Sequence, residues 1–283
     1  MTDLARRSTS AGAPVWQINR GHLLCWLALI ATLNSFAGVA IVTLAQRGWG
    51  YALFELFGVS AISWTALAAA IALLRGGGDE RVRRGDWLAA ALTAAFAILP
   101  VASASAIALT GLSIWMIGTA APGAAIRRAG IICLALTGTL IWGRLFLALF
   151  SHPLLDIDAW FVAQVFGVDQ ASNTLAFVGG DGGGIAVAPG CSSWQGMSLA
   201  LLFWVTVNQW FSVKLSWRSV GWCLAVLVAT VAVNVVRIGA MVRFPAYLDE
   251  IHHGWGWHLS MWSTLLAVVL LTLYGARREA FPR

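Results

Sequence analysis

The sequence has 283 residues, of which 59% are hydrophobic and 11% are charged. Soluble domains contain about 25% charged residues, so this composition excludes an ordinary soluble protein. The net charge of +6 at pH 7 does not indicate a nucleic-acid partner, because membrane proteins concentrate Lys and Arg in their cytoplasmic loops.

Apolar segments long enough to cross a bilayer recur along the chain and predict an all-α polytopic membrane protein. We expect eight spans, at residues 23–46, 51–74, 87–99, 105–120, 129–150, 193–211, 220–244 and 254–274. The apolar segment 87–121 is too long for one span and is divided at Pro100, which cannot donate a helix hydrogen bond. The first span has no cleavage site after it, so we interpret it as a retained helix.

Residues 1–283 are expected to form one integral membrane domain. It would comprise five helices over residues 1–150, an extracytoplasmic loop over 151–190 and three further helices over 191–275. The loop contains two predicted elements. Residues 154–166 have apolar side chains at helical spacing, which predicts an amphipathic helix along the membrane surface. Residues 174–178 and 185–187 flank a glycine-rich segment and predict a short β-hairpin.

The distribution of basic residues predicts the topology. All but four of the 18 Lys and Arg residues fall on one side of the eight-span arrangement, which the positive-inside rule assigns to the cytoplasm. Both termini are then cytoplasmic, and we expect the protein in the plasma (inner) membrane. The basic residues on that side are Arg6, Arg7, Arg20, Arg75, Arg81, Arg83, Arg84, Arg127, Arg128, Lys214, Arg218, Arg277, Arg278 and Arg283.

Cys191 stands where the polar loop turns into the sixth span. Ser192 and Gln195 have the spacing of a capping box, which would place Cys191 at the positive end of a helix. That position favours a thiolate over a thiol. The alternative is a buried, inert small side chain. The other three cysteines lie in apolar segments, so no disulfide framework is expected.

Arg237 lies inside the seventh span, where a charge costs about 2.5–3.5 kcal/mol on insertion scales. Asn234, three residues earlier, would share its helix face. A functional cation is one interpretation, and a structural arginine paired with a carboxylate or with carbonyl groups is the other. Arg144, in the fifth span, is interpreted as structural or facing lipid.

Three histidines, His252, His253 and His258, fall within seven residues before and at the start of the eighth span. A membrane-surface belt is one alternative, because tryptophans intervene between them. A metal site is another, but these histidines and Cys191 do not have a usual zinc-ligand spacing, so we expect no metal and no cofactor. The predicted topology brings Cys191, Arg237 and the histidines to one membrane face. A thiol, an imidazole and a fixed cation together suit acyl transfer.

The sequence resembles the exosortase/archaeosortase family of polytopic membrane transpeptidases, over residues 154–274 by motifs and over the whole chain by span count. The resemblance is carried by Pro189-Gly190-Cys191-Ser192-Ser193, by Asn234-Val235-Val236-Arg237, and by a histidine before Gly-Trp. The family's His-x-x-x-Gly-Trp spacing selects His252, with His253 and His258 as alternatives. Two departures, Ser193 in place of glycine and Pro189-Gly190 before the cysteine, indicate a divergent subfamily.

The resemblance implies that Cys191, Arg237 and His252 are catalytic, with Asn234 and Ser192 in supporting roles. The substrates would be exported proteins with a C-terminal tail made of a short motif, a membrane helix and a basic end. The chain would cleave this tail and transfer the protein, through a thioester, to a lipid or envelope amine or to water. A transporter or channel with an Arg- and His-lined path, or a non-catalytic membrane assembly factor, are the alternatives.

Overall fold

The structure is a computed structural model that describes residues 19–77, 80–99, 101–179 and 182–280. Helices make up 81% of it, with little sheet. Five helical segments are long and apolar enough to cross a membrane: Arg20–Phe54, Ala102–Thr119, Ala125–Leu149, Trp217–Arg243 and Trp255–Glu279. The chain is thus an all-α protein of the multi-pass membrane type, as the composition predicts.

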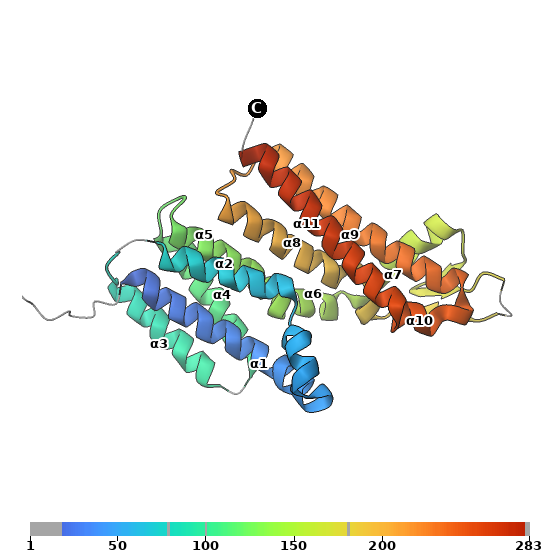
Figure 1. Cartoon of the computed structure of the whole chain (residues 1–283), viewed down its shortest axis with the longest axis horizontal. Helices are drawn as coiled ribbons and strands as arrows, with labels where there is room; N and C mark the ends of the chain where they lie inside the picture. Colours follow the sequence, from blue (N-terminus) through green and yellow to red (C-terminus); the bar gives the residue numbers. More distant parts are fainter. Residues whose placement is uncertain (1–18, 78–79, 100, 180–181, 281–283) are drawn as a thin grey trace, which may run out of the picture.

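The first half of the chain forms an N-terminal bundle (Figure 1). Its core consists of apolar side chains from α1, α2, α4 and α5, and Leu202 of α8 joins it. The last helix of this half is interrupted by the π-helix η2 before it continues as α6. The elements are α1 (Arg20–Phe54), α2 (Ala61–Arg75), α3 (Arg84–Ile98), α4 (Ala102–Thr119), α5 (Ala125–Thr137), η2 (Gly138–Trp142) and α6 (Gly143–Leu149).

The second half packs three long helices, α8 (Ser193–Trp210), α9 (Trp217–Arg243) and α11 (Trp255–Ala280), against one another. The short helix α10 (Leu248–His252) precedes α11, and α7 (Ser151–Phe166) lies against α9. Three short antiparallel strands in the order β1-β2-β3 follow α7 at the same end of the molecule (Figure 1). They are β1 (Gln170–Ala171), β2 (Thr174–Ala176) and β3 (Gly184–Ala186), with Leu175 opposite Gln170 and Ile185.

The helix and the hairpin expected within residues 151–190 are present. The helix is α7, which begins three residues earlier than predicted, at Ser151, and its exposed side carries apolar residues such as Trp160 and Val165. The hairpin is β2 with β3, and β1 adds a strand that the pattern did not predict. Gly180 and Asp181, within the expected turn, lie outside the described residues.

The prediction of eight spans is not confirmed by the five candidate helices. The three expected spans outside that set are α8, with 18 residues, and α2 and α3, with 15 residues each. The two shorter ones differ from a usual span in length. A helix of that length rises about 22 Å, which is less than the roughly 30 Å of a bilayer's hydrocarbon core. The expected division near Pro100 is confirmed, since α3 ends at Ile98 and α4 begins at Ala102. Pro100 itself lies outside the described residues.

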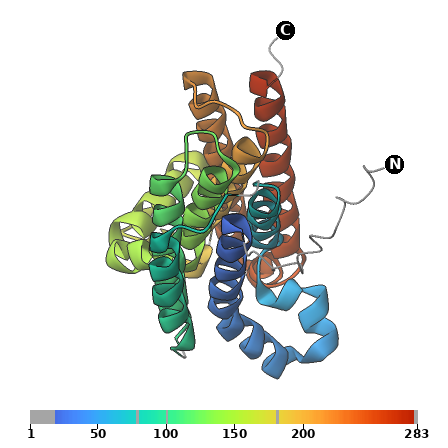
Figure 2. The same ribbon diagram turned by 90° about the vertical axis from the view of Figure 1, so that its left-hand side faces the viewer.

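The expected start of the second span, at residue 51, is wrong. Helix α1 kinks at Gly48, where φ is 75°, and then continues to Phe54. A turn with left-handed backbone at Leu56 and Phe57 follows, and α2 begins only at Ala61, where the Ser60 hydroxyl accepts a hydrogen bond from the Ile62 amide. Figure 2 shows the displaced end of α1, in lighter blue, turning away from the bundle.

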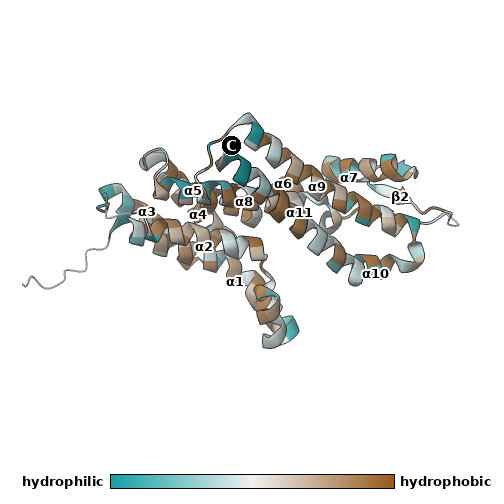
Figure 3. Ribbon diagram, turned by 45° about the horizontal axis from the view of Figure 1, so that its top comes forward, coloured by the Kyte–Doolittle hydropathy of each residue, from teal (hydrophilic) through white to brown (hydrophobic). Residues whose placement is uncertain are grey.

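The outer surface of the helices is strongly apolar. Ile98 is 81% exposed and Val228 is 66% exposed, and both belong to helices rather than to loops. Such side chains form large exposed apolar surfaces only where something other than water covers them. In Figure 3 the hydrophobic colour follows the lengths of the helices, while hydrophilic residues gather at helix ends and connections. This is the surface of a protein embedded in lipid.

Helix ends at one end of the molecule are hydrogen bonded to one another. Arg20, at the start of α1, is fully buried, and its Nε donates to both carboxylate oxygens of Asp86 in α3 at 3.2 and 3.0 Å. The indole of Trp115, near the end of α4, donates to the same carboxylate at 2.8 Å. Ser216 and Glu279 likewise join the start of α9 to the end of α11. These pairings support the alternation of helix directions. Arg6, Arg7 and Arg283 lie outside the described residues.

Candidate active site

Cys191 lies in a short 3-10 turn, η3 (Pro189–Cys191), that connects β3 to the start of α8. Pro189 begins this turn because its ring already has a helical φ. The Cys191 side chain is buried in a cluster with apolar residues of α7, β2 and α9. The expectation that Cys191 stands at a helix start is therefore confirmed, with one intervening residue before α8.

The predicted capping box is only half formed. Ser192 is the N-cap of α8, and its hydroxyl accepts a hydrogen bond from the Trp194 amide at 3.2 Å. The prediction of a reciprocal hydrogen bond between the Gln195 side chain and the Ser192 amide is wrong, because that amide donates to the Pro189 carbonyl within the 3-10 turn. The Gln195 side chain instead lines a cavity next to α8.

His252, the last residue of α10, lies directly against the cysteine. Its Nε2 atom is 3.0 Å from Sγ of Cys191, although the two residues are 61 positions apart in the sequence. This is a hydrogen-bonding distance for sulfur, at which a thiol donates to the unprotonated nitrogen of a neutral imidazole. Of the three histidines considered from the sequence, the structure brings His252 to Cys191.

His253 lies behind His252 rather than beside the cysteine. Its Nε2 is 2.9 Å from Nδ1 of His252, and its Nδ1 is 3.2 Å from Oδ1 of Asp249. The contacts thus form a line from Cys191 through two imidazoles to an exposed carboxylate. His258 is exposed on α11 and packs its ring against Trp257. It does not join this line.

The pKa of His252 is lowered from its usual value of 6.5, chiefly because burial disfavours the imidazolium. The positive charges of protonated His253 and of Arg237 lower it further, while the Asp249 carboxylate opposes the shift. His252 therefore stays neutral over a wider pH range than a solvated histidine. A neutral imidazole is the form that accepts a proton from a thiol.

Asn234 and Arg237 hold the main chain of the nucleophile. Nδ2 of Asn234 donates to the Cys191 carbonyl oxygen at 2.8 Å, and Nη2 of Arg237 lies 3.4 Å from the same oxygen. Nη2 of Arg237 also donates to Oδ1 of Asn234 at 3.0 Å, so the expected shared helix face is confirmed. Nε of Arg237 is buried and has no hydrogen-bond partner among the described residues. One edge of the guanidinium is therefore available to an incoming acceptor.

Asp158, on α7, is a site residue that sequence reasoning missed. Its buried carboxylate accepts hydrogen bonds from the Ser192 hydroxyl at 2.6 Å, from the Ser193 amide at 3.1 Å and from the Ser193 hydroxyl. Asp158 occurs three residues after Leu155 and one before Ala159, on the apolar face of the predicted helix. An acidic residue on that face was the signal in the sequence.

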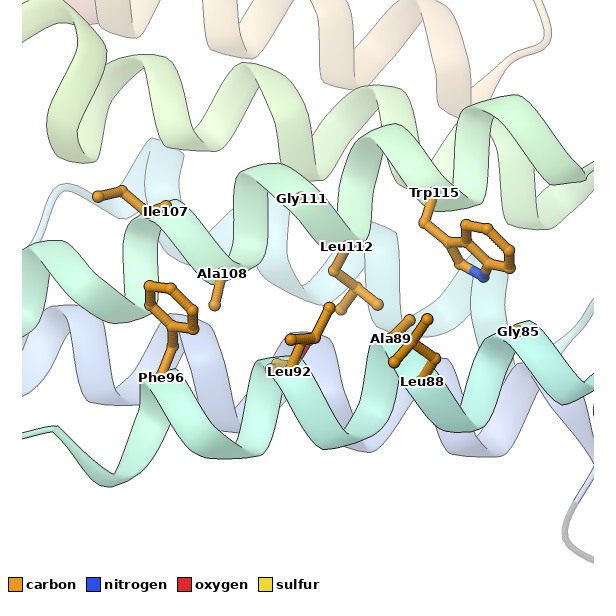
Figure 4. Close-up of a pocket in the computed structure, with 11 residues that line it drawn as sticks. Gly85, Leu88, Ala89, Leu92, Phe96, Ile107, Ala108, Gly111, Leu112 and Trp115 are labelled. Atoms are coloured by element: carbon orange, nitrogen blue, oxygen red, sulfur yellow. The ribbon is translucent and has the colours of Figure 1, made fainter.

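An apolar cavity of about 600 Å³ begins at Arg237 and extends between α9, α10 and α11. Small residues, among them Ala240, Gly256 and Ser260, form part of its walls. A separate groove of about 290 Å³ lies between α3 and α4, far along the chain from the cysteine (Figure 4). Apolar side chains such as Leu88, Leu92 and Phe96 line that groove, and its described lining residues include no ionisable side chain.

Among the described residues, no group of three or more His, Cys, Asp or Glu side chains is arranged to hold a metal ion. The Cys191 thiol instead contacts the His252 imidazole, and the Arg237 guanidinium contacts the Asn234 amide and the Cys191 carbonyl. Comparisons of the chain with family models, with curated proteins and with solved structures found no match.

Proposed function

We propose that this protein is a membrane-embedded cysteine transpeptidase of the exosortase/archaeosortase type, which cleaves C-terminal sorting tails of exported proteins. The observation that carries the proposal is the 3.0 Å separation between Cys191 Sγ and His252 Nε2. A nucleophile within hydrogen-bond reach of its base is the signature of covalent catalysis. A transporter or an assembly factor has no need of this contact.

The first half-reaction forms a thioester. Nε2 of His252 accepts the proton of the Cys191 thiol, and the thiolate attacks the carbonyl carbon of the scissile peptide bond. The tetrahedral intermediate collapses when His252 returns its proton to the leaving amine. The C–N bond breaks, the tail departs with a free amino group, and the exported protein remains attached to Sγ as an acyl group.

Arg237 stabilises the oxyanion of the tetrahedral intermediate. The amide groups of Cys191, Ser192 and Ser193 already donate to Ala188, Pro189 and Asp158, so they are not free to bind the oxyanion. The buried Nε of Arg237 has no partner among the described residues and supplies a donor. A preorganised donor of this kind contributes roughly 2.7–4 kcal/mol to transition-state stabilisation. Asn234 keeps the guanidinium in place.

The second half-reaction transfers the acyl group. An amine of a lipid or envelope component attacks the thioester carbon, His252 accepts the amine proton, and the C–S bond breaks to leave an amide and the free thiol. Water in place of the amine gives hydrolysis. In the topology we propose, with both termini cytoplasmic, Cys191 works at the extracytoplasmic face of the plasma membrane.

The apolar cavity that begins at Arg237 supports a substrate that arrives from within the membrane. Its lining is almost entirely apolar, so it suits the membrane helix of a sorting tail more than a hydrated peptide. Ala240 of α9 and Ser260 of α11 are small residues in its walls, which allow another helix to approach closely.

The proposal is tested by co-expression with an exported protein that carries such a tail. Cys191→Ala is expected to abolish tail cleavage while membrane insertion continues. Cys191→Ser is expected to do the same, and mass spectrometry of the wild-type protein under acid quench is expected to find substrate acyl groups on Cys191. Cys223→Ala is the matched control, because Cys223 lies in α9 away from His252, and it should retain wild-type cleavage. Cleavage that persists in Cys191→Ala contradicts the proposal.

A further inference from the structure

A second polar site lies on the other side of α8 from the cysteine. It is a cavity of about 690 Å³ between α1, the start of α2, α4, the η2–α6 segment and the first turn of α8. Four of its lining side chains are Ser63, Ser103, Arg144 and Gln195. None of these four side chains forms a hydrogen bond or an ion pair with another described residue. Ser63 is buried, whereas Ser103, Arg144 and Gln195 are exposed at the mouth of the cavity, so a cation, an amide and two hydroxyls line it with unused donors.

Arg144 is the member of this set that most requires a partner. It lies near the end of the apolar segment Ala125–Leu149, where a charge without a partner is unfavourable. The described residues that line the cavity include no Asp or Glu. Arg20, by contrast, is fully buried and bonded to Asp86 and Glu80. The unbalanced charge of the cavity is thus positive, and it favours an anionic ligand.

The cavity is connected to the catalytic site through the first turn of α8. The indole of Trp194, three residues after Cys191, donates to the Gly143 carbonyl at 2.9 Å and stacks on Phe146 at 4.6 Å between ring centroids. A side chain at residue 143 would come within 2.6 Å of the Gly138 carbonyl, so glycine allows the close packing around η2. These contacts fix the backbone on both sides of Arg144.

We infer that this cavity binds a phosphate group, carried by the headgroup of a membrane lipid. A guanidinium binds phosphate through paired hydrogen bonds, and the hydroxyls of Ser63 and Ser103 with the Gln195 amide complete a set of neutral donors. The volume exceeds what a phosphate ion alone fills, and apolar residues such as Leu145 and Leu147 line the remainder, which suits a glycerol backbone and acyl chains. The inference does not depend on the activity of Cys191.

The test measures binding to the full-length protein in detergent, followed by tryptophan fluorescence and by the thermal unfolding midpoint. The probes are dihexanoyl phosphatidylglycerol, dihexanoylglycerol without phosphate, and inorganic phosphate. The phospholipid is expected to bind and to raise the midpoint, and Arg144→Gln should weaken its binding about tenfold or more, as expected for the loss of charge-assisted hydrogen bonds. Arg47→Gln is the matched control, because Arg47 contacts Tyr51 outside the cavity, and it should bind like wild type.

Equal affinity of wild type and Arg144→Gln for the phospholipid would overturn the inference, as would equally tight binding of dihexanoylglycerol. If inorganic phosphate binds as tightly as the phospholipid, the proposal that the ligand is a lipid is contradicted, and the site binds a free anion. Ser103→Leu fills the cavity from α4 and leaves Arg144 in place. It should also weaken phospholipid binding, and unchanged affinity there would show that Arg144 binds lipid outside the cavity.

Discussion

The carboxylate of Asp158 accepts a hydrogen bond from the hydroxyl of Ser192 at 2.6 Å. A buried acid on α7 therefore holds the residue next to the candidate nucleophile. Two further hydrogen bonds, from the amide and hydroxyl of Ser193, reach the same carboxylate. Asn234 and Arg237 hold the Cys191 carbonyl from the opposite side. The main chain of Cys191 is therefore held between α7 and α9.

We expect Asp158→Asn to lower kcat with little change in KM, because the amide weakens the support of the nucleophile without touching the substrate. Charge-assisted hydrogen bonds contribute about 1.5–3 kcal/mol, so the free energy of unfolding should fall by an amount of that order. Turnover of a tail-bearing substrate and unfolding in detergent measure the two effects. Asp169→Asn, at an exposed position before β1, is the control and should change neither. A selective rise in KM would contradict a positioning role for Asp158.

The pKa of His252 predicts opposite effects of two neighbouring substitutions on the pH profile. Activity requires neutral His252, and its lowered pKa places the acid limb of kcat/KM below pH 6.5. His253→Gln removes a positive charge that lowers this pKa, so the limb should move to higher pH. Asp249→Asn removes a charge that raises the pKa, so the limb should move to lower pH. Shifts of both variants in the same direction would exclude electrostatic tuning along this line of contacts.

Arg237→Lys should reduce cleavage by about 10²–10³-fold, the usual cost of one oxyanion donor. An ammonium group cannot donate to Asn234 and to an oxyanion with the geometry of a planar guanidinium. Initial rates of tail cleavage measure the loss. Arg243→Lys, at the exposed end of α9, is the matched control and should remain near wild type. Near-normal rates in Arg237→Lys would leave Arg237 with a structural role.

The predicted topology is tested with single reporter cysteines in a variant that lacks the four native ones. Ala171→Cys, exposed in β1, should react with a membrane-impermeant thiol reagent in intact cells. Leu215→Cys, in the exposed connection between α8 and α9, should react only after the membrane is permeabilised. The reverse pattern would place the candidate active site in the cytoplasm.

Apolar segment length predicted most of the helices, because burial in lipid is a property of consecutive residues. The start of α2 was not predictable in this way. The chain turns there through left-handed backbone at Leu56 and Phe57, two residue types that rarely adopt it, and local sequence gives no sign of such a turn. The prediction of a complete capping box was wrong because of a residue upstream. The Pro189 carbonyl accepts the hydrogen bond of the Ser192 amide, which Gln195 was expected to accept.

The candidate site likewise contains contacts that the sequence predicted and contacts that it did not. Asn234 and Arg237 are three residues apart, so their contact follows from helix geometry alone. The choice of His252 over His253 rested on a family resemblance, and the approach of His252 to Cys191 spans 61 residues of chain. Asp158 was visible as an acid on an apolar face, but its partners lie 34 and 35 residues away. These hydrogen bonds join α7 to the start of α8, a contact that no local sequence pattern predicts.

The close packing of α7 against α9 depends on Gly239. A methyl group at this position of α9 would come within 2.0 Å of the Phe166 ring at the end of α7. Glycine at this position therefore lets α7 and α9, the two helices that hold the cysteine, pack closely. His252 and one wall of the apolar cavity belong instead to α10 and α11. A substrate that entered by displacing α10 and α11 would also move His252 away from the thiol, so the thiol would regain its base only when these helices returned.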